Sequence, residues 1–330
     1  MPLFSVEGKN LKQLPFLSVI VCARNEESNL PDLLHAIAKQ SYKNFELIVV
    51  NDHSSDGTES VVRSFTAENP NFRVVNAKGE GKKNALKEGI AASSGEIIVQ
   101  TDADCIPTEK WLKTIAFYLA ENESDLVIAP VKMEASSAFE EMQALEFMSL
   151  VASGAGAAAV GMPVMCNGAN LIYKRSLWKE AAHAQQEEFV SGDDMFLLLS
   201  AKKSKKKITF LKSVEAIVTT KAASSVSGFL RQRQRWASKS TGYRDFSVLL
   251  TAFVVFALAV LFFIMLLAGK FKLLLFVFLW KGLIDFFFLS CTAPFFDLQR
   301  CLKWVFPVAA IYPFYIVYAV FLGFFGKKRW

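Results

Sequence analysis

The chain has 330 residues, a formal net charge of +6 and 52% hydrophobic residues. This length suits one substantial domain and a smaller one. The hydrophobic residues are concentrated in 246–326, while 1–240 has the composition of a soluble α/β protein, so the two parts need separate explanations. Five cysteines without a CxxC pair argue against a disulfide framework or a zinc site.

The first part of the chain alternates short apolar runs with amphipathic stretches. Four apolar runs are too short for helices and predict buried strands at 17–23, 45–50, 72–75 and 96–100. The stretches between them predict helices, one opened by Ser28-Asn29 with Pro31 in its first turn, one ending near Ala67 and one beginning at Lys82. Strands that alternate with helices imply an α/β fold with a mainly parallel sheet.

Polar residues follow three of these predicted strands: Arg24-Asn25-Glu26, Asn51-Asp52 and Asp102-Ala103-Asp104. Ligands bind at the carboxyl ends of strands in such sheets. Asp102 and Asp104 can address one hard cation through carboxylate oxygens, and a Mg²⁺ or Mn²⁺ there would neutralise a departing diphosphate. The alternative is a pair of turn and cap residues before a helix that starts near Pro107.

The C-terminal part predicts three membrane-spanning helices, since each needs about 20 apolar residues. The predicted spans are 246–268, 271–290 and 305–325. The second contains Lys281 and Asp285, which lie four residues apart and can pair on one helical face.

Basic residues before the first span favour a cytoplasmic N-terminal part: Arg231, Arg233, Arg235, Lys239 and Arg244. Three spans would export the basic tail 327–329, so one stretch is re-entrant or interfacial, or the bulk of the domain decides the orientation. Residues 1–15 lack the apolar core of a signal peptide. We expect a multi-pass protein of the cell (inner) membrane.

Lysines cluster at 202–207, either as a solvated turn or as a contact with anionic lipid headgroups. No nucleic-acid motif accompanies the cluster, so no nucleic acid partner is expected. The Ala-, Gly- and Met-rich stretch 139–165 suits either an interfacial or a buried helix.

Short motifs follow one another along the chain: 19–26 (VIVCARNE), 50–58 (VNDHSSDGT), 81–86 (GKKNAL), 102–104 (DAD), 192–194 (GDD) and 232–236 (QRQRW). This order resembles the family 2 inverting glycosyltransferases with the GT-A fold. It looks most like their membrane-bound branch, which includes cellulose, chitin and hyaluronan synthases. The resemblance covers roughly residues 16–240. It implies a Rossmann-like mixed sheet flanked by helices in a cytoplasmic domain at 1–235, followed by a membrane domain at 236–330.

The resemblance implies a nucleotide-sugar donor, with UDP-sugar expected, and assigns the donor side residue by residue. Ala23 and Glu26 would line the nucleoside pocket, and Asp52 would hydrogen-bond the uracil or ribose. Lys82, or Lys83 in its place, would face the diphosphate. Asp102 would touch the sugar or ribose and Asp104 the metal, with Asp102 as a further ligand.

On the acceptor side, Asp194 matches the catalytic base that takes the acceptor hydroxyl's proton. Asp193 stands where the family usually has glutamate, and its alternative role is a helix N-cap. Asn167 and Gly168 occupy the place of the acceptor loop, where glycine allows close backbone approach.

Gln232, Arg235 and Trp236 match the QxxRW motif, in which arginine stabilises the diphosphate and the indole stacks on a sugar. The alternative is a basic and aromatic belt beside the membrane.

The resemblance predicts transfer to a lipid-linked or membrane-proximal glycan acceptor, with membrane lipids as partners and a possible homo-oligomer. A processive polysaccharide synthase is the first alternative, although three spans are few for a translocation conduit. A membrane-anchored nucleotidyltransferase would leave Asp194 and QxxRW without a role. A non-enzymatic scaffold would not need the polar motif positions filled.

Overall fold

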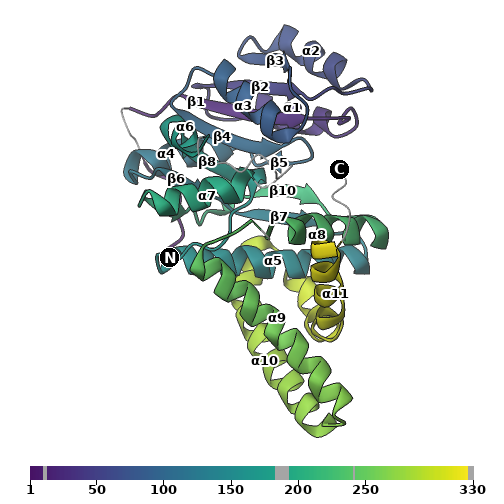
Figure 1. Ribbon diagram of the computed structural model, residues 1–330. Helices are drawn as coiled ribbons and strands as arrows, with labels where there is room; N and C mark the ends of the chain where they lie inside the picture. Colours follow the sequence, from purple (N-terminus) through teal and green to yellow (C-terminus); the bar gives the residue numbers. More distant parts are fainter. Residues whose placement is uncertain (10–12, 183–192, 241, 326–330) are drawn as a thin grey trace. The chain divides into compact units, whose positions relative to one another are not determined.

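The computed structural model describes residues 1–9, 13–182, 193–240 and 242–325 (Figure 1). The strands are β1 (Leu17–Ala23), β2 (Phe45–Asn51), β3 (Phe72–Asn76), β4 (Ile97–Asp102), β5 (Ile106–Pro107), β6 (Leu126–Ile128), β7 (Val131–Glu134), β8 (Leu171–Lys174), β9 (Ile208–Phe210) and β10 (Val218–Lys221). The α-helices are α1 (Leu30–Ala38), α2 (Thr58–Glu68), α3 (Lys82–Ala92), α4 (Trp111–Glu121), α5 (Ala138–Ala159), α6 (Arg175–Ala182), α7 (Asp193–Lys203), α8 (Val226–Ser240), α9 (Phe246–Leu267), α10 (Phe271–Phe296) and α11 (Val305–Phe325). Short 3₁₀ turns are η1 (Gly168–Asn170), η2 (Val214–Ala216) and η3 (Gln299–Trp304).

Among the described residues, seven strands form the main sheet in the order β3-β2-β1-β4-β8-β6-β9. β1 lies between β2 and β4 and is parallel to both, whereas β8 runs antiparallel to β4 and β6. Separately, β5 pairs with β10. The predicted α/β fold with a mixed sheet is confirmed, and its first four strands are parallel as expected.

The parallel register aligns the ends of three strands. Ala23 of β1 lies opposite Asn51 of β2, and Cys22 of β1 lies opposite Asp102 of β4. The carboxyl ends of these strands therefore meet at one edge of the sheet, which is where ligands bind in this kind of fold.

Helix α3 packs on β1 and β2 and begins at Lys82 near this edge. A Cβ atom at Gly89 would lie 2.7 Å from a methyl carbon of Val50 and 2.8 Å from one of Ile20. Both neighbours are fully buried. Glycine at this position therefore lets the helix lie close against the sheet.

The chain divides into two compact units, 1–132 with 154–220, and 133–153 with 221–330. The first unit contains the main sheet and the second contains the hydrophobic helices. The sequence places a boundary at 235, whereas the second unit also includes 133–153 and 221–235, because α8 packs against α11 and pairs with residues of α5. The division of catalytic and membrane functions between 1–235 and 236–330 stays a prediction.

Among the described residues, three helical segments are long and apolar enough to cross a membrane: 246–267, 271–296 and 299–321. This confirms three candidate spans. The second was expected to end at Ser290 but continues to Phe296, because the intervening residues are mostly apolar and the helix stops only at Asp297, which has a left-handed backbone (φ 54°). Lys281 and Asp285 form the expected ion pair.

In the second unit, α9 and α10 form a hairpin, and α11 packs against α8, α9 and α10 (Figure 1). Helix α5 covers much of the predicted stretch 139–165 but ends at Ala159, since Gly161 takes a positive φ of 77° and Pro163 follows.

Candidate active site

Asp102 is the last residue of β4 and pairs with the first residue of α3. Its Oδ1 atom lies 2.5 Å from Nζ of Lys82. Burial lowers the pKa of Lys82, but the carboxylates of Asp102 and then of Asp194 raise it, and the net shift is upward. Lys82 is therefore held as a cation beside two of the predicted site aspartates, and both side chains of the ion pair remain about one-third exposed.

Asp104 and Glu26 lie within electrostatic reach of each other and of Asp102. Burial is the main cause that raises the pKa of Asp104, and the neighbouring Asp102 adds to it. Burial likewise raises the pKa of Glu26 most, followed by repulsion from Asp104 and Asp102. Oδ2 of Asp104 accepts a hydrogen bond from Thr220 at 3.2 Å. Three carboxyl groups thus share one poorly solvated region.

The carboxylates do not form a complete metal cage. Among the described residues, no group of three or more His, Cys, Asp or Glu side chains is arranged to hold a metal ion. Mg²⁺ is usually bound through one or two carboxylates, with water and substrate phosphates completing its shell. Asp102 and Asp104 fit that kind of partial site.

Ala23 ends β1 and Asp52 directly follows β2, so both lie at the same edge of the sheet as Asp102. The Asp52 side chain is nearly fully buried, and its two carboxylate oxygens accept from the Gly81 amide at 2.9 and 3.1 Å. Its own amide donates to the Ala23 carbonyl at 2.8 Å. Gly81 has a φ of 95°, so a glycine suits this turn before α3. Asp52 thereby fixes the loop that leads into Lys82.

Asp194 lies in the first turn of α7 and contacts the acceptor loop predicted from the sequence. Its Oδ2 atom accepts from the Gly168 amide at 3.1 Å. A Cβ atom at Gly168 would lie 2.9 Å from Nε2 of Gln100 and 3.7 Å from Oδ2 of Asp194. Asn167 caps the same turn, since its side chain accepts from the Ala169 amide at 3.0 Å.

These contacts bring most of the predicted donor residues and the predicted base into the first unit. Lys82 lies under the electrostatic influence of both Asp102 and Asp194, which links the two ends of the site. The side chain of Asp193, together with Gly192 and His183, lies outside the described residues.

The QxxRW residues lie on α8 in the second unit. Arg235 is exposed, while Trp236 is half-buried and packs its ring 6.2 Å from that of Phe147. Oε1 of Gln232 accepts from Nη1 of Arg233 at 2.7 Å. Arg233, named from the sequence only as one of the basic residues before the first span, is buried within the motif and pairs with Glu146.

Sequence reasoning missed three supporting residues. Thr220 contacts Asp104 from β10, 116 positions along the chain, and Glu146 reaches Arg233 from α5. Gln100 packs against Gly168. The sequence did offer two signals: Gln100 is a polar residue in an apolar strand, and Glu146 lies in a helix rich in apolar residues. Neither signal predicts which residue the side chain contacts.

Residues 18–180, about half of the chain, match the family described as Glycosyl transferase family 2. Together with the relatives below, this match places the chain in glycosyltransferase family 2, and the sheet and its flanking helices are the GT-A fold that the sequence predicted. Residues 18–180 thus resemble a domain found in sugar-transferring enzymes.

Two curated relatives illustrate the match. Glycosyltransferase AglE of Haloferax volcanii is 34% identical over 117 residues, which cover 34% of this chain and 38% of that protein. The poly-beta-1,6-N-acetyl-D-glucosamine synthase of Staphylococcus epidermidis is 24% identical over 234 residues, covering 68% of this chain and 55% of the synthase. The match therefore spans well under two-thirds of either relative.

A solved structure, the mannosyltransferase PcManGT from Pyrobaculum calidifontis in complex with GDP-Man and Mn²⁺, shares the fold. It superposes with a TM-score of 0.57 at 19% identity and covers 96% of this chain and 89% of its own.

Proposed function

We propose that this protein transfers a sugar from a nucleotide-sugar donor, expected to be a UDP-sugar, to a lipid-linked or membrane-proximal glycan acceptor with inversion at the anomeric carbon. The observation that carries this proposal is the cluster formed by Lys82, Asp102, Asp104 and Asp194 at the strand edge. It supplies one cation for a diphosphate, two carboxylates for a metal and one carboxylate for a base.

In this reaction Asp194 takes the proton of the acceptor hydroxyl, whose oxygen attacks the anomeric carbon. The bond from that carbon to the diphosphate breaks, and the nucleoside diphosphate leaves with the bonding electrons. The Gly168 amide orients the Asp194 carboxylate, which leaves its remaining lone pairs for the acceptor. Lys82 and Arg235 bind the diphosphate, Trp236 stacks on the sugar and Gln232 positions it.

A divalent metal, Mg²⁺ or Mn²⁺, would be held by Asp104 and Asp102. When bound it neutralises charge on the leaving diphosphate. The raised pKa values of Asp104 and Glu26 fit such a site, because burial first, and then the neighbouring carboxylates, disfavour the ionised forms, and a bound cation would favour them. Ala23, Glu26 and Asp52 line the nucleoside side in this proposal, and Asn167, Gly168 and Asp193 the acceptor side.

A processive polysaccharide synthase is the second candidate. It is supported by the match to the Staphylococcus epidermidis synthase, which extends over more of this chain than the match to AglE. Three candidate spans are few for a conduit that moves a polymer, so transfer of a single sugar or a short chain is preferred.

We further propose that the catalytic unit faces the cytoplasm, on the basis of the basic residues before the first span. With three spans the C-terminus would lie on the opposite side. Protease accessibility of epitope tags placed before Met1 and after Trp330, in right-side-out and inverted vesicles, tests both statements. Protection of the two tags in the same vesicles would contradict three crossings.

The deciding experiment measures donor turnover by the purified protein in detergent, with UDP-, GDP- and dTDP-sugars and with Mn²⁺, Mg²⁺ or EDTA. We expect metal-dependent release of one nucleoside diphosphate that is abolished in Asp104→Ala. Release of pyrophosphate would instead identify a nucleotidyltransferase. The absence of both turnover and nucleotide binding under every condition would favour a non-catalytic scaffold.

A further inference from the structure

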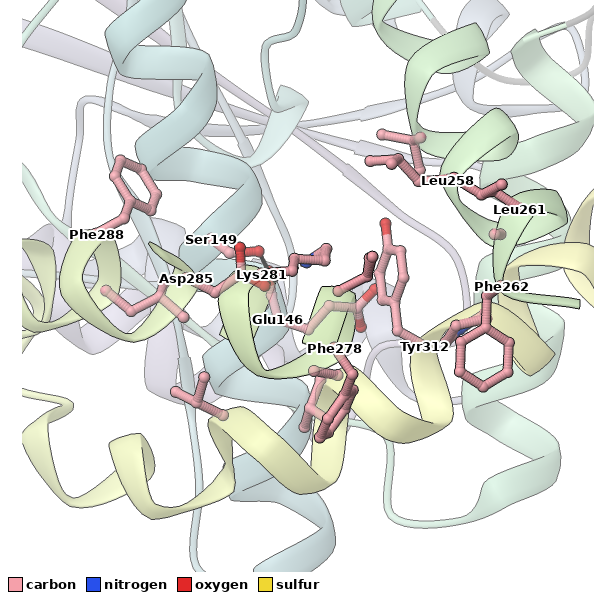
Figure 2. Close-up of a pocket in the computed structure, with 18 of the residues that line it drawn as sticks. Glu146, Ser149, Leu258, Leu261, Phe262, Phe278, Lys281, Asp285, Phe288 and Tyr312 are labelled. Carbon is pink, nitrogen blue, oxygen red and sulfur yellow. Dashed lines mark hydrogen bonds and ion pairs between the residues drawn. The ribbon is translucent and has the colours of Figure 1, made fainter. Parts of the chain in front are cut away.

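The second unit contains a cavity of about 250 Å³ between α5, α9, α10 and α11 (Figure 2). Its walls are mainly apolar and include Leu258, Leu261, Phe262, Phe278 and Phe288. The cavity is slightly smaller than the ~300–1,000 Å³ typical of sites for drug-sized ligands. It is therefore suited to a segment of a hydrocarbon chain rather than to a whole lipid.

The residues that line this cavity include Glu146, Ser149, Lys281 and Asp285, here called the polar cluster (Figure 2). They come from α5 and α10, and Tyr312 of α11 adds a phenol to the same cavity. Lys281 and Asp285 lie within a candidate membrane helix, where ionisable residues are costly, so their position at a cavity is a reason to look for a ligand.

The charges of the polar cluster are already balanced. Lys281 pairs with Asp285 on the same helix, and Glu146 pairs with Arg233 of α8. An anionic group entering the cavity would therefore find no net positive charge. Hydroxyl groups, which both donate and accept hydrogen bonds, are suited to such a paired set without separating the ions.

We propose that this cavity binds a neutral glycolipid, with its hydrocarbon chain against the apolar walls and the hydroxyl groups of its first sugar at the polar cluster. The helices that surround the cavity are those apolar enough to lie in a bilayer, so lipid is the available source of such a chain. This inference rests on the proposed function in one respect: the bound glycolipid is taken to be the sugar acceptor.

The experiment uses the full chain in phosphatidylcholine nanodiscs and a hexadecyl glucoside that carries a diazirine on its alkyl chain. Crosslinked residues are mapped by mass spectrometry, with unlabelled hexadecyl glucoside or hexadecyl phosphate as competitor. We expect labelling of cavity residues on α5 and α11, and competition at least about tenfold stronger by the glucoside, equivalent to 1.4 kcal/mol.

Adjacent alanines on α11 provide a matched pair of variants. Ala309 lines the cavity, whereas Ala310 is exposed and does not line it. Ala309→Phe should lose the cavity labelling, and Ala310→Phe should retain it. A double variant, Lys281→Met with Asp285→Met, removes an ion pair as a whole, a change that proteins often tolerate. It should keep the chain labelling but abolish the preference for glucoside over phosphate.

Equal labelling of the two alanine variants, or competition by the phosphate as strong as by the glucoside, would overturn the proposal. The double variant decides the question if Ala309→Phe is not monodisperse. Labelling does not require sugar transfer. Active enzyme without cavity labelling would therefore refute this inference alone, while labelling without donor turnover would refute only the proposed function.

Discussion

Arg233 and Glu146 form a buried ion pair between α8 and α5, with exposed side-chain fractions of 5% and 8%. The guanidinium also lies 4.5 Å from the ring centre of Phe229 and 4.3 Å from that of Trp236. It donates to Gln232 as well. One buried arginine thus contacts two residues of the QxxRW motif and fixes their positions on the helix.

Arg233→Met should therefore destabilise the protein by about 3–5 kcal/mol, because it leaves the Glu146 charge buried without its partner. Arg233→Lys keeps the charge but loses the planar contact with the rings, so an intermediate loss is expected. Unfolding in denaturant measures the stability, and kcat and KM for the donor report on the motif. Arg231→Met, an exposed change on the same helix, is the control.

Replacing both partners tests whether the loss of stability comes from leaving one buried charge unpaired. Arg233→Met combined with Glu146→Leu should recover much of the lost stability, since an apolar pair replaces a buried ionic one. If Arg233→Met is as stable as Arg231→Met, the ion pair does not hold the helix.

Asp194→Asn should lower kcat by about 10²–10⁴, the usual contribution of a general base, and leave nucleotide affinity unchanged. The asparagine oxygen can still accept from the Gly168 amide, although the Met195 amide, which donates to the other carboxylate oxygen at 2.9 Å, loses that acceptor. Steady-state kinetics and nucleotide titration measure the two effects. Asp32→Asn, in the first turn of α1, is a control of the same chemistry outside the site. Activity within a few-fold of the wild type would exclude Asp194 as the base.

The strands and the polar residues at their ends could be predicted from the sequence because both signals are local. The run at 17–23 is apolar except for Ser18 and is followed at once by Arg24, so strand and strand end can be predicted from neighbouring residues. Parallel pairing then brings Asp102 beside Cys22 whatever the details of the connecting helices.

Contacts between distant segments could not be predicted. The hydrogen bond between Thr220 and Asp104 depends on the antiparallel pairing of β10 with β5. Strands this short leave no pattern in the sequence from which their pairing could be predicted. The predicted second span ends at Ser290, whereas α10 continues through Pro294 to Phe296, so the end of this helix was not predicted.

Gly168→Ala should lower activity and stability, because the added methyl group must displace the buried Gln100 side chain from 2.9 Å. Overpacking of this kind costs about 1–3 kcal/mol. Gly156→Ala is the matched control, since nothing lies within 4 Å of its Cβ position in α5, and it should be neutral or slightly stabilising. Thermal unfolding and kcat measure both variants. If the two variants have similar Tm and kcat, the surroundings of Gly168 accommodate the methyl group without disturbing Asp194.

The raised pKa values of Glu26 and Asp104 predict an unusual dependence of stability on pH. In the metal-free protein these groups bind protons more tightly in the folded state than in the unfolded chain. Their contribution to the free energy of unfolding therefore falls as pH rises from their ordinary pKa values toward the raised ones. Asp104→Asn removes one such group and should raise Tm at pH 7 in EDTA.

In excess Mn²⁺ the wild type should instead have a higher Tm than Asp104→Asn. An ion that binds only the folded protein stabilises it by mass action, and it prefers ionised carboxylates. The wild type should gain more in Tm from Mn²⁺ at pH 7 than at pH 5, and Asp104→Asn should gain little at either pH. Asp56→Asn provides a control of opposite sign. A hydrogen bond from the Thr58 side chain lowers the pKa of Asp56, so its loss should reduce Tm in EDTA and leave the gain from Mn²⁺ unchanged. A Mn²⁺ effect on Tm equal in Asp104→Asn and the wild type would place the metal elsewhere or remove it from the reaction.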